Sequence, residues 1–160
     1  MSQHLKIAAA QLGPLHRSDT RTAAVKRLVA LLREAHGAGA KFVVFPELAF
    51  TTFFPRWLVE DQAEVDARYF ERQMPSPETQ PLFDEAKKLG IGFYIGYAEL
   101  DEEQGRIRRF NTAILVTPEG NIAGKYRKVH LPGHADHKPQ AAFQHLEKKY
   151  FEVGDQGFRT

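Results

Sequence analysis

Apolar residues in the first part of the chain form short continuous runs that are separated by a segment with helical spacing. Residues 5–11 are a short run rich in alanine that ends before a Gly-Pro pair, which predicts a buried strand followed by a turn. Residues 18–20 offer N-cap groups, and apolar residues then recur at helical spacing as far as Gly37, which predicts a helix. Residues 41–45 contain a Phe-Val-Val-Phe run before a proline, which predicts a strand buried on both faces. This order predicts a crossover unit of a parallel sheet.

The pattern continues with a second helix and further strands. Residues 76–90 begin with Ser-Pro-Glu and then carry an apolar stripe, which predicts a helix with its N-cap at the serine. Residues 91–97 predict the strand that follows. Residues 110–117 and 121–128 are joined by Pro-Glu-Gly, which predicts an antiparallel hairpin, and residues 143–151 predict a short helix. The predicted fold class is therefore α/β with a mixed sheet.

The composition indicates an ordinary globular domain. The chain has 160 residues, of which 42% are hydrophobic and 26% charged, and this balance excludes a disordered or collagen-like protein. The 22 lysines and arginines and 20 acidic residues are interspersed and leave a net charge of +2, which argues against a nucleic-acid partner. Because no apolar run is long enough for a signal peptide or a membrane span, we expect a cytoplasmic protein with no membrane partner.

Cysteine is absent from the chain. Its absence excludes disulfides, thiolate metal sites and a cysteine nucleophile within these residues. The histidines are spaced too irregularly for a common metal motif, and His134 with His137 alone is a weak indication of a site. We therefore predict neither a metal nor a cofactor.

Two segments carry polar residues where the strand pattern predicts an end of the sheet. Glu47 follows an apolar strand at the edge where open α/β sheets bind ligands, and a carboxylate there could act as a general base. The alternative is a solvated loop glutamate. In residues 125–133, three cations and His130 follow another strand. The alternative here is a basic strand edge that only prevents aggregation.

Together the two segments resemble the nitrilase superfamily, the carbon-nitrogen hydrolases with a Glu-Lys-Cys triad. The matching motifs are Phe-Pro-Glu-Leu at 45–48 and Tyr-Arg-Lys-Val-His-Leu at 126–131, and they follow each other in the same order as in the superfamily. Within the superfamily, the sequence motifs at 51–57, 109–112 and 143–148 are similar to those of the N-carbamoyl-D-amino acid amidohydrolases, or D-carbamoylases. The resemblance extends over almost the whole chain.

The resemblance implies a fold and a mechanism. Residues 1–160 would be the N-terminal portion of a carbon-nitrogen hydrolase domain, a four-layer αββα sandwich roughly twice this length, ending before the nucleophilic cysteine. Glu47 would be the general base and Lys128 would stabilise the oxyanion. The cysteine would attack the carbamoyl carbon of an N-carbamoyl amino acid and expel ammonia, and hydrolysis would then give a D-amino acid and carbon dioxide.

Three further residues match supporting positions of the superfamily. His130 and His145 would help to position the substrate and to hydrogen-bond the catalytic carboxylate, and the alternative for each is a structural histidine. Glu147 would keep the catalytic lysine charged and oriented, and its alternative is an exposed partner for a neighbouring lysine. Asn111 is interpreted as a structural amide that ties strand ends together.

The missing cysteine and the missing part of the fold have consequences. We expect the 160 residues alone to be inactive, and we expect one apolar sheet face to be open, which favours association and poor solubility. The resemblance implies a homo-oligomer for the full-length protein. A related amidase or β-ureidopropionase is an alternative, because the superfamily shares the residues matched by Glu47 and Lys128. A catalytically silent interaction module is another.

Overall fold

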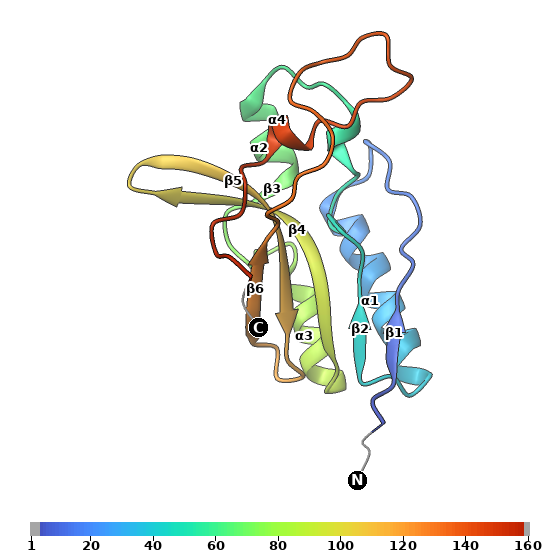
Figure 1. Ribbon diagram of the computed structural model, residues 1–160. Coiled ribbons are helices and arrows are strands. Elements are labelled where there is room, and N and C mark those ends of the chain that lie inside the picture. Colours follow the sequence, from blue (N-terminus) through green and yellow to red (C-terminus); the bar gives the residue numbers. More distant parts are fainter. Residues whose placement is uncertain (1–3, 159–160) are drawn as a thin grey trace.

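A mixed sheet with helices on one face organises the protein in the computed structural model, which describes residues 4–158 (Figure 1). In chain order the elements are β1 (Ile7–Ala9), α1 (Arg21–Gly37), β2 (Phe42–Val44), a 3-10 turn η1 (Phe54–Arg56), α2 (Gln62–Tyr69), β3 (Phe70–Glu71), α3 (Gln80–Leu89), β4 (Gly92–Glu103), β5 (Arg106–Val116), β6 (Ile122–Arg127) and α4 (Glu147–Tyr150). The strand order in the described residues is β1-β2-β4-β5-β6, and β3 pairs with β4. The pairs among β1, β2, β3 and β4 are parallel, whereas β4-β5 and β5-β6 are antiparallel. The predicted α/β class with a mixed sheet is confirmed.

The two long helices differ in how they begin, because only α1 has a side-chain N-cap hydrogen bond. Thr20 caps α1 as predicted, because its side chain accepts a hydrogen bond from the backbone of Ala23 at 3.1 Å. Helix α3 begins later than predicted, since its N-cap is Thr79 rather than Ser76. Ser76 and Thr79 are joined by backbone and side-chain hydrogen bonds, so residues 76–79 form a turn before the helix. The sequence therefore predicted this helix correctly but placed its N-cap three residues too early.

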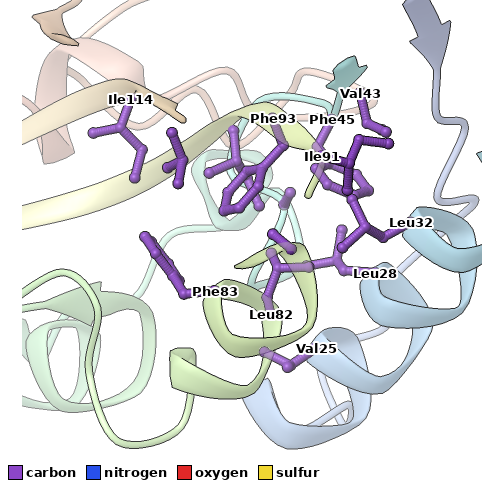
Figure 2. Close-up of a cluster of buried hydrophobic side chains, with 14 of the residues drawn as sticks. Val25, Leu28, Leu32, Val43, Phe45, Leu82, Phe83, Ile91, Phe93 and Ile114 are labelled. Atoms are coloured by element: carbon purple, nitrogen blue, oxygen red, sulfur yellow. The ribbon is translucent and has the colours of Figure 1, made fainter. Parts of the chain in front are cut away.

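The main hydrophobic core lies between α1, α3 and one face of the sheet (Figure 2). The helices contribute Val25, Leu28, Leu32, Leu82 and Phe83, and the strands contribute Val43, Phe93 and Ile114. Phe83 meets Phe93 edge to face, with ring centroids 5.2 Å apart. Since burying one such side chain stabilises the fold by about 1.5–3 kcal/mol, this layer holds both helices on the sheet.

The opposite face of the sheet is uncovered in the described residues. Ala9, Val44, Tyr94, Leu115 and Gly124 are paired in register across five strands and form one transverse row, which we call the open-face row. Val44 and Tyr94 are each 38% exposed and Leu115 is 43% exposed. The prediction that the strand around Val44 is buried on both faces is therefore wrong for this structure, whereas the predicted open apolar face is confirmed.

The β4-β5 hairpin extends well beyond the strands predicted from the sequence. Strand β4 continues to Glu103 and β5 starts at Arg106. Gln104 and Gly105 between them both have positive φ, 52° and 79°, as the two central residues of a type I′ hairpin turn require. The prediction failed because this end of the hairpin is charged, so it lacks the apolar pattern of a strand.

A second hydrophobic cluster packs Ala98 and Leu100 of β4 against α2 and α4. At its centre, the Phe54 ring stacks on Tyr69 at 4.6 Å and meets Tyr150 edge to face at 5.3 Å. Helix α2 was not predicted. The helix predicted over residues 143–151 shortens to α4, because the backbone N–H of Leu146 donates to Pro55 instead of to a helical carbonyl. No helix within residues 4–158 is long and apolar enough to cross a membrane.

Candidate active site

Glu47 lies just beyond the end of β2, in a turn that is pressed against β4. The backbone N–H of Ala49 donates to the carbonyl of Gly96 at 2.9 Å, which holds the turn to the strand. A Cβ atom on Gly96 would lie 2.9 Å from the Cα of Glu47 and 3.0 Å from the nitrogen of Leu48. Leu48 itself has a φ of +48°, a conformation that non-glycine residues rarely adopt. The fold therefore places Glu47 through a close backbone contact that only glycine at position 96 allows.

Lys128 follows the last residue of β6, and its ammonium lies between two carboxylates. The Lys128 Nζ donates to Glu47 Oε1 at 2.8 Å and to Glu147 Oε2 at 2.9 Å. Partial burial disfavours the charge, but the hydrogen bonds to Glu47 and Glu147 outweigh it and raise the pKa of the Lys128 ammonium above its ordinary value. Lys128 is therefore a fixed cation at neutral pH.

Glu147 is the more deeply placed of the two carboxylates. It is the first residue of α4 and only 1% exposed, so its alternative as an exposed partner of a neighbouring lysine is wrong. Its second oxygen, Oε1, lies 3.2 Å from the Nε2 of His145. The His145 ring in turn packs edge to face on Phe53, with centroids 5.8 Å apart. The structure thus joins four of the five predicted site residues, Glu47, Lys128, Glu147 and His145, in one hydrogen-bonded chain.

His130 is the predicted residue that the structure leaves outside this chain. It is exposed, and its ring stacks on Phe158 at 5.9 Å. Among the described residues, no hydrogen bond or ion pair joins His130 to Glu47 or Lys128. The structure therefore shows no contact of His130 with Glu47 or Lys128, and a role of His130 in substrate positioning stays a prediction.

Asn111 was not predicted as part of the site, yet it contacts Glu47 directly. It lies in the middle of β5, is 4% exposed, and its Nδ2 donates to Glu47 Oε1 at 2.6 Å. A single asparagine in a strand carries no signal that points to a residue 64 positions away, which is why sequence reasoning assigned it a strand-tying role.

A cavity of about 430 Å³ opens beside Glu47. Its walls come from residues 12–17 and from the segment between Pro46 and Trp57. Glu47 is the only acidic residue among those that line it, whereas Arg17 and Arg56 bring positive charge. Neither arginine forms an ion pair with a carboxylate of residues 4–158. In the same part of the chain, no three His, Cys, Asp or Glu side chains are grouped closely enough to hold a metal ion.

This geometry is suited to proton transfer beside a fixed positive charge. The Glu47 side chain is 43% exposed and lines the cavity, so it can exchange a proton with a molecule bound there. The Lys128 ammonium, 2.8 Å from that carboxylate, can stabilise negative charge that develops on such a molecule. A cysteine nucleophile is not among the described residues.

Comparison with known proteins gives the family of the chain. Residues 6–160 match the family model described as carbon-nitrogen hydrolase. The chain is 33% identical over 158 residues to a nitrilase from Pyrococcus abyssi, covering 98% of this chain and 50% of that protein. It is 32% identical over 117 residues to an omega-amidase from Danio rerio, covering 73% and 38%. It is also 29% identical over 145 residues to an N-carbamoylputrescine amidase from Arabidopsis thaliana, covering 89% and 41%.

Solved structures show the same fold. A carbon-nitrogen hydrolase from Helicobacter pylori superposes with a TM-score of 0.66 at 24% identity, and an amidase from Nesterenkonia superposes with 0.65 at 21%. Each match covers 96% of this chain, but only 45% and 49% of the respective solved chain. The chain therefore spans about half the length of the relatives that it matches.

Proposed function

The chain belongs to the carbon-nitrogen hydrolase family, and from this premise we propose that it forms the Glu-Lys part of an N-carbamoyl-D-amino acid hydrolase. The observation that carries the proposal is the contact of the Lys128 ammonium with Glu47 at 2.8 Å and with Glu147 at 2.9 Å. The words beside these residues, at 51–57, 109–112 and 143–148, favour the carbamoylase branch of the family.

In the proposed mechanism, the third catalytic group is a cysteine outside these 160 residues. Glu47 takes the thiol proton, and the thiolate attacks the carbamoyl carbon. The tetrahedral oxyanion lies beside Lys128, and it collapses when Glu47 returns the proton to the departing ammonia. Water, activated by the same carboxylate, hydrolyses the thioester, and the released carbamate loses carbon dioxide to give the amino acid.

The charge of the cavity supports an anionic substrate. Arg17 and Arg56 line the cavity without carboxylate partners among the described residues, so they are available to a substrate carboxylate. An N-carbamoyl amino acid carries such a carboxylate. N-carbamoylputrescine carries an ammonium instead, which the two guanidinium groups would repel. This favours a carbamoyl amino acid over the substrate named for the relative in Arabidopsis thaliana.

Hydrolysis of an ω-amide is a second candidate, and the identity to the omega-amidase of Danio rerio favours it. The substrate of an ω-amidase combines an amide with a carboxylate, so the same cavity charge would suit it. Both candidates use Glu47 and Lys128 in the same roles, and a β-ureidopropionase would do so too. Substrate comparison must separate them.

The experiment is to measure ammonia release by the 160-residue chain and by a version extended along its own reading frame through a cysteine. Substrates are N-carbamoyl-D-phenylglycine, its L enantiomer, N-carbamoyl-β-alanine, N-carbamoylputrescine and an ω-amide. We expect activity on the D-carbamoyl substrate in the extended form alone, reduced by about 10²–10⁴-fold in Glu47→Gln and in Lys128→Ala. Glu34→Gln, an exposed glutamate on α1, is the control and should leave the rate unchanged.

Other outcomes decide between the candidates. Hydrolysis of the ω-amide without the carbamoyl substrate would transfer the assignment to the amidase. Hydrolysis of N-carbamoyl-β-alanine without the D-carbamoyl substrate would transfer it to a β-ureidopropionase. Activity in the 160-residue chain, which has no cysteine, would overturn the covalent mechanism.

A further inference from the structure

Asn111 contacts the site through both its side-chain amide and its main-chain carbonyl. Its side-chain Nδ2 donates to Glu47 Oε1 at 2.6 Å, and its main-chain carbonyl accepts the backbone N–H of Lys128 at 2.8 Å. One buried residue therefore contacts both members of a pair that are 81 positions apart in the chain.

We infer that Asn111 is a positioning residue that fixes the orientation of the Glu47 carboxylate for proton transfer. Two donors, the Asn111 amide and the Lys128 ammonium, converge on Glu47 Oε1. Among the described residues no donor is bound to Oε2. Oε1 is thereby occupied and Oε2 is the oxygen that exchanges the proton. The inference deepens the proposed function and rests on the role of Glu47 in it.

The surroundings of Asn111 argue against a purely strand-tying amide. Its partner in register on β4 is Ala98, which has no polar side chain. The next residue, Thr112, bonds to Glu99 at 2.6 Å in a separate buried network. Glu47 is thus the hydrogen-bond partner that the structure gives to the Asn111 side chain, and an amide donor suits a carboxylate acceptor where an aspartate would repel it.

Lys128 alone cannot hold Glu47 in this orientation. Its ammonium is shared with Glu147, which is almost fully buried, whereas the Glu47 side chain is 43% exposed. Without Asn111, Glu47 is free to turn toward water while the ammonium stays with Glu147. The Asn111 amide holds the base from the side of the sheet and so keeps it next to the cation.

The first test measures kinetics in the extended protein with the best substrate found above. Asn111→Ala should lower kcat by about 10- to 100-fold with KM within about twofold, because a misplaced base loses part of its contribution. Asn111→Asp, of nearly the same shape, should lower kcat more at neutral pH and recover toward acid, where a protonated carboxyl can again donate. The matched control is Asn121→Ala, an exposed asparagine in the β5-β6 turn, which should change nothing.

The second test needs no substrate and therefore separates this inference from the proposed function. Competitive acetylation with acetic anhydride reports how readily Lys128 loses its proton. In Asn111→Ala the labelling of Lys128 should rise by about three- to tenfold relative to the exposed Lys148, because one of its two carboxylate partners is released. Wild-type labelling of Lys128 in Asn111→Ala, or wild-type kinetics in a folded Asn111→Asp, would overturn the inference. If Asn111→Ala fails to fold, Asn111→Asp decides by the same measurements.

Discussion

Lys128 stands between two carboxylates that differ in their access to water. Glu147 is 1% exposed and the Glu47 side chain is 43% exposed. The buried carboxylate keeps the ammonium charged in a place where charge is costly, and it has no access to a bound molecule. The exposed carboxylate can gain and lose a proton. Glu147 therefore holds the Lys128 ammonium in place, and Glu47 is the carboxylate beside it that is open to solvent.

Replacement of Glu147 tests the structural part of this division. Glu147→Gln should lower the free energy of unfolding at pH 7 by about 1–3 kcal/mol, because Lys128 loses a buried partner. A raised pKa in the folded state means that this contribution is fully present below the ordinary lysine value and is lost as pH rises through the raised value. Urea titration should therefore show a difference from wild type at pH 7 that shrinks above about pH 10.5.

Glu34→Gln, on the exposed side of α1, is the control for the loss of a negative charge. It should unfold like the wild type at both pH values. Equal stability of Glu147→Gln and wild type at pH 7 would contradict the role given to Glu147.

The sequence predicts a residue of the site only where the family resemblance also assigns that residue a role. The resemblance assigns a role to both Glu47 and Lys128, and the structure places them in contact. The alternative of an exposed Glu147 was wrong because burial depends on how residues 131–146 fold back over η1, and no local pattern encodes that path. Asn111 was assigned a different role for a similar reason, since its partner is fixed by β-sheet register rather than by sequence spacing.

Strand β4 determines where the site can form. Gly96 of this strand packs closely against the turn that carries Glu47, since a Cβ atom there would lie 2.9 Å from the Cα of Glu47. The strand was predicted over residues 91–97, which contains this glycine, but its pairing with β5 as far as Arg106 was missed. Helix α2 was missed although Asp61 caps it and Glu64 follows at the capping-box position, a signal that could have found it.

Adding one methyl group to β4 tests how tightly the turn depends on it. Gly96→Ala should destabilise the fold by about 1–3 kcal/mol, because the new Cβ would meet backbone atoms that cannot rotate away. It should also reduce activity in the extended protein by moving Glu47 from Lys128. Thermal melts and ammonia release are the measurements.

Gly124→Ala in β6 is the matched control, because its nearest neighbour would be a side-chain atom at 3.9 Å. It should change stability by less than about 0.5 kcal/mol. If the two alanine variants behave alike, the close approach at Gly96 does not constrain the turn.

The whole chain has a covered side and an uncovered side. Helices α1 and α3 bury one face of the sheet, and the open-face row leaves Val44, Tyr94 and Leu115 partly exposed on the other. A continuous apolar surface of this kind favours association in water.

The 160-residue chain alone should therefore form concentration-dependent oligomers or precipitate. Val44→Thr with Leu115→Thr should increase the monomer fraction, because threonine keeps the strand preference and removes apolar surface. Sedimentation velocity over a range of concentrations is the measurement. Val153→Thr, 58% exposed but outside the sheet, is the control and should leave association unchanged. A wild-type chain that stays monomeric at all concentrations would contradict the prediction.

The separation of Glu47 and Lys128 in the sequence also has a consequence for folding during synthesis. Glu47 is translated 81 residues before its partner, which corresponds to roughly 4–16 s at the usual rate of synthesis. For much of that interval β4 (Gly92–Glu103) has not been synthesised, so β2 cannot pair with it. Throughout the interval the Glu47 carboxylate lacks its Lys128 partner. Lys128, in contrast, is followed by Glu147 after only 19 residues. Lys128 and the buried Glu147 are thus synthesised close together in time, and both are synthesised after Glu47.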